Sequence, residues 1–291
     1  MTLSFAPEIP PHGLASVMAD WRMDHVPSVV GDQRSLRAHR PSPPERFTAL
    51  VIAQLLRGVA EAWPLVSAIA RAHAHAHVGT DRAHFFLDPA RLPADADCTA
   101  VGLLLLLDTG HLSERDAHRA LELIAQTTTS QGVVATYFER SGDRANIVDA
   151  VVRANVVRLA RRLGRLDEVA ATRRYLHALV ASDGHLDGSR YYPSPDSLLY
   201  TLALGDRFEA LRPAVRARIG ATDHVLDLAQ RCLAADRLGI ANTRDREALR
   251  ARRLSDGTWP AEGWFCYGRS RAWFGSRALS TAFALAALEA G

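Results

Sequence analysis

The stretch LPADADCTAVGLLLLL (residues 92–107) joins two acidic residues, a thiol and a hydroxyl to the start of a strongly apolar run. A helix over Val101–Leu107 would be apolar on nearly every side, so it must be buried. Asp95, Asp97 or Thr99 can cap the first turn of that helix, but a cap needs only one acid. A second carboxyl group in apolar surroundings beside another carboxylate tends to keep its proton near neutral pH. The stretch therefore predicts a Brønsted acid at the mouth of a buried helix.

The composition is that of an ordinary soluble globular protein of 291 residues, with 48% hydrophobic and 23% charged residues. All 35 basic residues are Arg, and they are scattered among 32 acidic residues to give a net charge of +3. This distribution predicts no nucleic-acid partner.

The three cysteines (Cys98, Cys232 and Cys266) are widely spaced and form no CxxC motif. They argue against a disulfide framework or a structural zinc site and are typical of a reducing compartment. Every apolar run is interrupted well before about 20 residues, so no signal peptide or membrane span is expected. We expect a cytoplasmic protein, and a hydrophobic substrate would leave peripheral membrane contact open.

The chain divides by composition near residue 44. Residues 1–44 are rich in Pro around one short amphipathic piece and predict an N-terminal arm that wraps the body. Residues 45–77 have a helical pattern that Pro64 splits in two. The only strongly β-like stretch is 133–138. The body, residues 45–291, is therefore predicted to be all-α.

A weak internal repeat predicts how these helices are arranged. Gly79, Gly132 and Gly184 are about 50 residues apart, and Gly257 follows after a longer interval. Each glycine lies between a polar-faced and an apolar segment, which indicates alternating outer and inner helices. This pattern predicts a single-domain α/α toroid (an α6/α6-like barrel of hairpins), with an open solenoid of the same hairpins as the alternative. The predicted inner segments are 97–107, 147–159, 197–204 and 279–288.

The acidic motif resembles that of a known enzyme family. Residues 97–100 (Asp-Cys-Thr-Ala) resemble the corresponding run of oxidosqualene cyclases, and residues 95–100 resemble the Asp-x-Asp-Asp-Thr-Ala run of squalene–hopene cyclases and other class II terpene cyclases. The turns at 130–132, 182–184 and 255–259 look like degenerate Gln–Trp repeats of these cyclases. One departure is Cys98, which stands where the hopene type has Asp; the oxidosqualene type has Cys there.

The resemblance implies roles for these residues. Asp97 would be the general acid that protonates an alkene or epoxide of an isoprenoid chain and starts its cyclisation. Asp95 would keep Asp97 protonated, and Cys98 and Thr99 would orient it. Complete cyclases usually pair this domain with a second toroid, for which the chain is too short, so a partner domain or a homo-oligomer is kept open.

Six further residues are candidates for binding the substrate. Asn155 interrupts an apolar helical stripe, and the segment 191–200 carries three tyrosines. The C-terminal segment 259–274 is rich in aromatic residues, whose faces stabilise cations by about 0.5–2 kcal/mol each. The alternatives are a satisfied polar group in the core, a packed corner and a hydrophobic plug. The candidates are Asn155, Tyr192, Tyr200, Trp259, Trp264 and Trp273.

Two other functions remain open from the sequence. One is a non-catalytic toroid that binds a lipid, a peptide or a partner protein. The other is a zinc-dependent subunit similar to the β-subunits of protein prenyltransferases, whose ligand pair is Asp-x-Cys, whereas Asp97 and Cys98 are adjacent here. The histidines at 73, 75, 77 and 84 fit a solvated helix end better than a metal site, so no metal and no cofactor are predicted.

Overall fold

The fold is built almost entirely from helices. The computed structural model describes residues 11–77, 81–139, 147–268 and 272–289. Within these residues, three short 3-10 helices join the longer elements: η1 (Ala60–Ala62), η3 (Leu166–Val169) and η4 (Gly184–Asp187). The helices are α1 (Pro11–Ala19), α2 (Phe47–Leu56), α3 (Trp63–His77), α4 (Ala96–Asp108), α5 (Glu114–Gln126), α6 (Ala150–Arg162), α7 (Ala170–Ala181), α8 (Pro195–Gly205), α9 (Leu211–Arg218), α10 (Val225–Arg237), α11 (Thr243–Ala251) and α12 (Arg277–Glu289).

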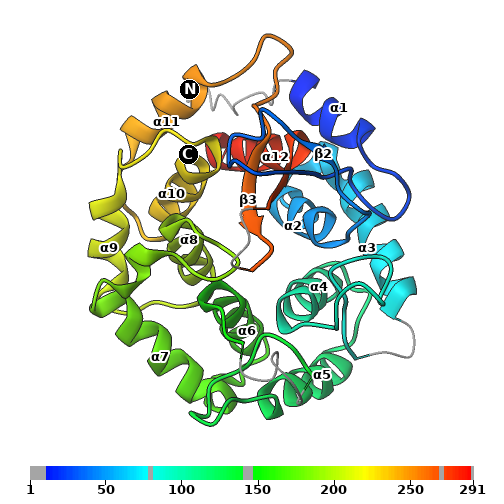
Figure 1. Cartoon of the computed structure of the whole chain (residues 1–291), viewed down its shortest axis with the longest axis vertical. Helices are drawn as coiled ribbons and strands as arrows, with labels where there is room; N and C mark the ends of the chain where they lie inside the picture. Colours follow the sequence, from blue (N-terminus) through cyan, green and yellow to red (C-terminus); the bar gives the residue numbers. More distant parts are fainter. Residues whose placement is uncertain (1–10, 78–80, 140–146, 269–271, 290–291) are drawn as a thin grey trace, which may run out of the picture.

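Alternate helices form the inside of the molecule. Helix α2 packs against α4, α4 against α6, α6 against α8, α8 against α10, α10 against α12, and α12 against α2. The helices α1, α3, α5, α7, α9 and α11 lie outside this series (Figure 1). Each outer helix of the series α3 to α11 packs against an inner helix next to it in the chain.

Burial explains which helices lie inside. Every residue of α4 from Ala96 to Leu107 is buried. In the outer helix α5, by contrast, the buried residues are Ala117, Ala120, Leu121 and Ile124, a stripe on one face of the helix. The apolar composition of α4 and the single stripe of α5 are thus the sequence features that separate inner from outer helices. The predicted inner segments correspond to α4, α6, α8 and α12.

A small antiparallel sheet crosses one end of the helical body. Its strands are β1 (Val29–Gly31), β2 (Arg40–Pro41), β3 (Glu262–Cys266) and β4 (Trp273–Ser276), in the order β2-β1-β4-β3. Val30 pairs with Phe274, and Gly263 pairs with Gly275. A Cβ atom on Gly275 would lie 1.9 Å from the carbonyl oxygen of Glu262, so only glycine allows this close pairing.

Two expectations about strands are corrected by this sheet. The body is mostly helical as predicted but is not all-α. Its strands have only two to five residues, and β1 pairs with β4 across most of the chain length, so no local alternation reveals the sheet. The predicted β-like stretch 133–138 forms no strand and makes only isolated bridges, from Val134 to Thr128 and from Tyr137 to Asp95.

The predicted N-terminal arm lies on the body. Helix α1 packs against α12, and β1 pairs with β4. The backbone amide of Gly263 donates to the carbonyl of Arg34, and the guanidinium of Arg34 binds the carboxylate of Asp227. The division of the chain at residue 44 stays a prediction.

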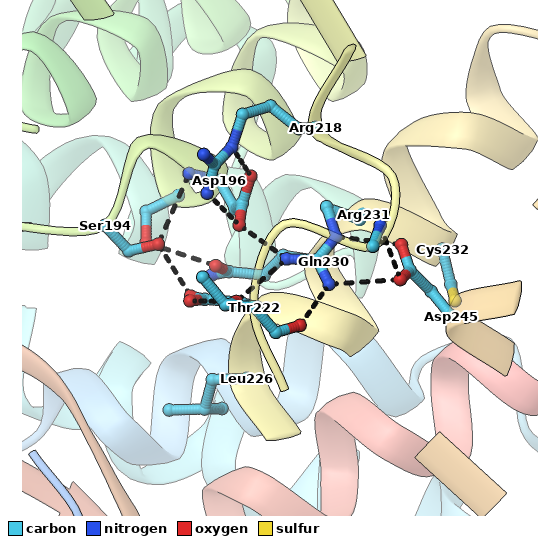
Figure 2. Close-up of polar contacts among 12 residues, drawn as sticks. Ser194, Asp196, Arg218, Thr222, Leu226, Gln230, Arg231, Cys232 and Asp245 are labelled. Carbon is cyan, nitrogen blue, oxygen red and sulfur yellow. Dashed lines mark hydrogen bonds and ion pairs between the residues drawn. The ribbon is translucent and has the colours of Figure 1, made fainter. Parts of the chain in front are cut away.

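A buried ion network ties α8, α9, α10 and α11 together (Figure 2). The fully buried guanidinium of Arg231 binds Asp196 and Asp245, each at 2.8 Å. Asp196 also accepts two hydrogen bonds from Arg218. Each buried charge therefore has a partner of opposite sign, which is the condition for keeping it in the core.

Among the residues that the structure describes, no helix combines the length and the apolar character needed to span a bilayer.

Candidate active site

The two acids of the opening motif have different positions at the start of α4. Asp95 is the N-cap residue, and its carboxylate accepts the backbone amide of Cys98 at 2.7 Å. Asp97 is already in the first turn and is also buried. Capping, the simpler explanation of the motif, therefore accounts for Asp95 and leaves Asp97 to be explained.

Asp97 is held by two side chains from other elements. Asn155 of α6 donates its amide to Oδ1 at 2.8 Å, and the hydroxyl of Tyr192 donates to Oδ2 at 2.5 Å. Both partners are buried. These two bonds fix the plane of the carboxyl group, because each of its oxygens has its own donor. Asn155 and Tyr192 are two of the predicted substrate-binding residues, and the structure places both at the predicted acid.

Burial makes both acids of the motif weaker. Burial, and to a smaller extent the neighbouring charge of Asp95, raise the pKa of Asp97 to about 7 against the opposing effect of the bonds from Tyr192 and Asn155. Burial likewise raises the pKa of Asp95 to about 6, against the bonds from Cys98. A carboxyl group with a pKa near 7 is half protonated at neutral pH, which suits a proton donor.

Asp97 lies on the wall of an apolar cavity. The space between the lining atoms is about 520 Å³ including its opening to solvent, and about 60 Å³ of it can hold the centre of a water molecule. Aromatic rings make up much of the wall: Phe265 and Phe274 stack at 5.5 Å, and Phe85 meets Phe265 edge-on at 5.3 Å. The lining residues are Phe47, Phe85, Leu92, Asp95, Asp97, Cys98, Thr136, Tyr137, Val152, Tyr191, Tyr192, Phe265, Cys266, Tyr267 and Phe274.

A second buried acid holds Tyr192 in place. Asp149 caps α6 by accepting the amides of Val151 and Val152, at 2.8 and 3.3 Å. Its other oxygen accepts the backbone amide of Tyr191 at 2.7 Å. Since α6 also carries Asn155, Asp149 fixes the segment with Tyr192 relative to the helix that supplies the other partner of Asp97.

The remaining motif residues have separate environments. Cys98 lines the cavity, and burial raises the pKa of its thiol well above the usual range, so it stays protonated. Thr99 is not among the lining residues of the cavity. Its hydroxyl accepts the amide of Ala83 at 2.9 Å and donates to the carbonyl of Asp95 at 2.7 Å, which fastens the neighbouring segment to α4.

The predicted tryptophans and Tyr200 lie away from the cavity surface. Trp264 is one layer behind it, 5.3 Å from the ring of Tyr192, and donates its indole N–H to Ser197. Trp259 is buried and donates to the carbonyl of Leu249. Trp273 is partly buried, with the guanidinium of Arg34 at 5.7 Å from its ring. Tyr200 packs edge-on against Phe283 at 5.6 Å.

Several lining residues were not among the sequence candidates. In the aromatic segment 259–274, the tryptophans were the predicted residues, but the cavity is lined by residues close to them in sequence. These are Phe265, Cys266, Tyr267 and Phe274. Thr136 and Tyr137 come from the β-like stretch 133–138, and the hydroxyls of Tyr137 and Tyr191 are 3.0 Å apart. Four lining residues have purely apolar side chains, so the sequence could not distinguish them from other core residues. They are Phe47, Phe85, Leu92 and Val152.

In the parts of the chain that the structure describes, no three His, Cys, Asp or Glu side chains are placed to hold a metal ion. His73 is buried, His75 is exposed, and His84 hydrogen-bonds the carbonyl oxygen of Leu92 through Nδ1. The side chain of His77 lies outside the described residues.

Sequence comparisons relate the chain to terpene cyclases. Residues 32–162 match the family model described as "Sesquiterpene cyclase astC-like C-terminal domain". The chain is 28% identical over 207 residues to drimenol cyclase drtB of Aspergillus calidoustus, a match that covers 67% of this chain and 38% of that protein. The matched region is thus less than half of the relative's length.

Structural comparisons show a shared fold along nearly the whole chain. The type II terpene cyclase MstE from Scytonema superposes with a TM-score of 0.69 at 13% identity, over 97% of this chain and 98% of that one. A variant of MstE in complex with geranylgeranyl dihydroxybenzoate, described as its substrate, gives 0.66 at 12% identity over 96% and 95%. A protein from Actinoplanes gives 0.69 at 18% identity over 96% and 97%.

The sequence matches make the chain similar to terpene cyclases, and the structural neighbours show that it shares their fold. Neither comparison singles out squalene–hopene cyclases.

Proposed function

We propose that the protein is a class II type of terpene cyclase, in which Asp97 protonates an isoprenoid chain and so starts its cyclisation. The observation that carries this proposal is the position of Asp97, a buried carboxyl group with a pKa of about 7 on the wall of an apolar, aromatic cavity. The relationship to terpene cyclases supports it. We also infer that the ring of inner and outer helices is the α/α toroid of that family.

The first chemical step follows from the partners of Asp97. The O–H bond of the protonated carboxyl group breaks as a C–H bond forms at one carbon of an alkene, which leaves a carbocation at the other carbon. Asn155 and Tyr192 donate to the two carboxyl oxygens, so they stabilise the carboxylate that remains. Aromatic faces along the cavity stabilise the cation. This arrangement supports the proposed step, because the hydrogen-bond donors would stabilise the negative charge and the aromatic rings the positive one.

The size of the cavity bears on the substrate. Typical small-molecule sites have volumes of about 300–1,000 Å³, whereas the comparable volume of this cavity is only about 60 Å³. Because only about 60 Å³ accepts a water centre, the aromatic walls must move apart to enclose a folded chain. The names of the matched family and of the fungal relative favour a C15 substrate.

The two other functions are less well supported. A toroid that only binds a ligand would be expected to have an open or polar centre, whereas this cavity is lined mainly by apolar and aromatic side chains. A zinc-dependent prenyltransferase-like subunit needs metal ligands that the described residues do not bring together. Peripheral membrane contact, a cytoplasmic location and a completing partner or second copy remain proposals.

Product formation tests the function directly. The wild-type protein is incubated with geranyl, farnesyl and geranylgeranyl diphosphates and the corresponding alcohols, and cyclised products are sought by mass spectrometry. We expect Asp97→Asn to lower product formation by about 10²-fold or more, because Asn cannot donate the proton. Asp167→Asn, which changes an exposed carboxylate outside the cavity, is the matched control. Equal activity of wild type and Asp97→Asn would exclude catalysis by this acid.

A further inference from the structure

A further hollow lies between the loop at residues 21–24, the start of α2, and α3. Its volume is about 650 Å³, measured in the same way as the 60 Å³ of the Asp97 cavity, as space for the centre of a water molecule. We call it the basic groove. Apart from histidines, four charged side chains line it, and three of them are arginines. Ala49, Leu50 and Ile69 contribute apolar walls, and the polar side chains that line it are Arg22, Asp24, Arg46, Arg71, His73 and His75.

Arg46 occupies the most informative position in the basic groove. Its side chain is half-buried, and among the described residues its guanidinium makes no hydrogen bond and no ion pair. Burial lowers the pKa of this group, and the charge of Asp24, which opposes that shift, only partly offsets it. Arg46 is also the N-cap residue of α2, where the helix dipole disfavours a cation. Neither burial nor helix capping therefore explains an arginine at this position.

The other arginines of the groove also lack carboxylate partners. Within the described part of the chain, Arg22 bonds only the carbonyl of Ala19, and Arg71 only the hydroxyl of Ser67. Asp24, the single acid of the groove, is 2.7 Å from His25. The groove thus contains three guanidinium groups and only one carboxylate, and that carboxylate already interacts with His25.

The basic groove is separate from the cavity of Asp97. The backbone of α2 lies between them, since Arg46 lines the groove and its neighbour Phe47 lines the cavity. No residue is shared by the two linings. A ligand in the groove would therefore lie beside the candidate active site without entering it.

We propose that the basic groove binds a phosphate-type anion, with Arg46 at its inner end and Arg22 and Arg71 at its rim. The planar guanidinium group donates in pairs to phosphate oxygens, and three such groups suit an anion with several oxygens. The apolar walls leave room for an organic substituent on the phosphate. A free phosphate or diphosphate and the headgroup of an anionic lipid share this chemistry.

Calorimetry with sodium phosphate and sodium diphosphate, at constant ionic strength set with chloride, tests the site. We expect diphosphate to bind the wild type, and Arg46→Gln to weaken binding by about tenfold or more, or about 1.4 kcal/mol. Arg115→Gln removes the same charge from an exposed position on α5 outside the groove and should change affinity less than about twofold. Equal binding by wild type and Arg46→Gln, or no binding of either anion, would overturn the proposal.

Three further experiments test whether the anion binds in this groove and what kind of molecule carries it. Arg71→Gln changes an exposed side chain, should fold normally, and should weaken binding by about threefold, so the test survives if Arg46→Gln misfolds. Asp97→Asn should leave anion binding unchanged, because the groove is separate from the cavity; a loss would place the anion in the cavity and overturn the assignment. Flotation with phosphatidic acid vesicles distinguishes a lipid source: Arg46-dependent flotation indicates a headgroup, and its absence with diphosphate binding indicates a free anion.

Discussion

At the level of single residues, the acid strength of Asp97 results from opposing influences. Burial and the charge of Asp95 favour the protonated form, whereas the hydroxyl of Tyr192 and the amide of Asn155 favour the carboxylate. The first pair keeps a proton available at neutral pH. The second pair lowers the free energy of the carboxylate that remains after the proton has left.

Removing the charge of Asp95 and removing the hydroxyl of Tyr192 should therefore shift the pH dependence of cyclisation in opposite directions. In the proposed mechanism Asp97 acts in its protonated form, so the rate should fall as pH rises through about 7. Asp95→Asn removes the neighbouring charge while keeping a good N-cap residue. It should lower the pKa of Asp97 and move this fall to lower pH by about one unit. Tyr192→Phe removes a donor to the carboxylate and should move it to higher pH.

The measurement is the rate of product formation between pH 5 and pH 9 for the wild type and both variants. Asp167→Asn, at an exposed site, should leave the profile unchanged. Shifts of the two profiles in the same direction would contradict the proposed origin of the pKa of Asp97.

The sequence revealed part of this site. Asp95 and Asp97 could be predicted because two acids at the start of an apolar helix are unusual, and Tyr192 because it belongs to a cluster of tyrosines. Phe47 and Phe274 could not, since only the folded chain brings them to the same cavity. An apolar ring gives no local sign of whether it faces a cavity or another side chain.

At the level of helices, predictability depended on what each helix buries. Helices α4, α8 and α12 bury mainly apolar or small residues, which identified them as inner helices. Helix α10 is also an inner helix, yet it buries Asp227, Gln230 and Arg231. Its sequence resembles that of a surface helix, because the partners that neutralise these groups lie in other elements.

The buried ion network of α10 predicts a large loss of stability when one partner is removed. Arg231→Gln leaves Asp245 buried without its guanidinium partner, so the free energy of unfolding should fall by about 3–5 kcal/mol. Arg252→Gln breaks the exposed pair with Asp223, which is also 2.8 Å long, and should cost less than about 1 kcal/mol. Urea unfolding compares the two variants. Equal losses would show that burial does not control the energy of these pairs.

At the level of the whole molecule, the candidate site lies where three inner helices begin. Asp97 is in the first turn of α4, Asp149 caps α6, and Tyr192 precedes the cap of α8, Ser194. The positive ends of helix dipoles favour negative charge. The arrangement therefore assists formation of the carboxylate of Asp97 when its proton is transferred.

The N-terminal segment contributes to the same body rather than extending from it. Val17 of α1 is fully buried, in a helix that packs on α12, whereas Met23 in the following loop is 85% exposed. Val30 of β1 is also buried and pairs with Phe274, a residue of the cavity wall. We therefore expect residues 11–44 to unfold together with the helices.

Substitutions in this segment test that expectation. Val17→Ala should lower the free energy of unfolding by about 2 kcal/mol, because it removes buried methyl groups and leaves a small cavity. Met23→Ala should change it by less than about 0.5 kcal/mol. Urea unfolding followed by both circular dichroism and tryptophan fluorescence should give one shared transition whose midpoint shifts only for Val17→Ala. An unchanged midpoint for Val17→Ala, or two separate transitions, would show that the segment is not part of the cooperative fold.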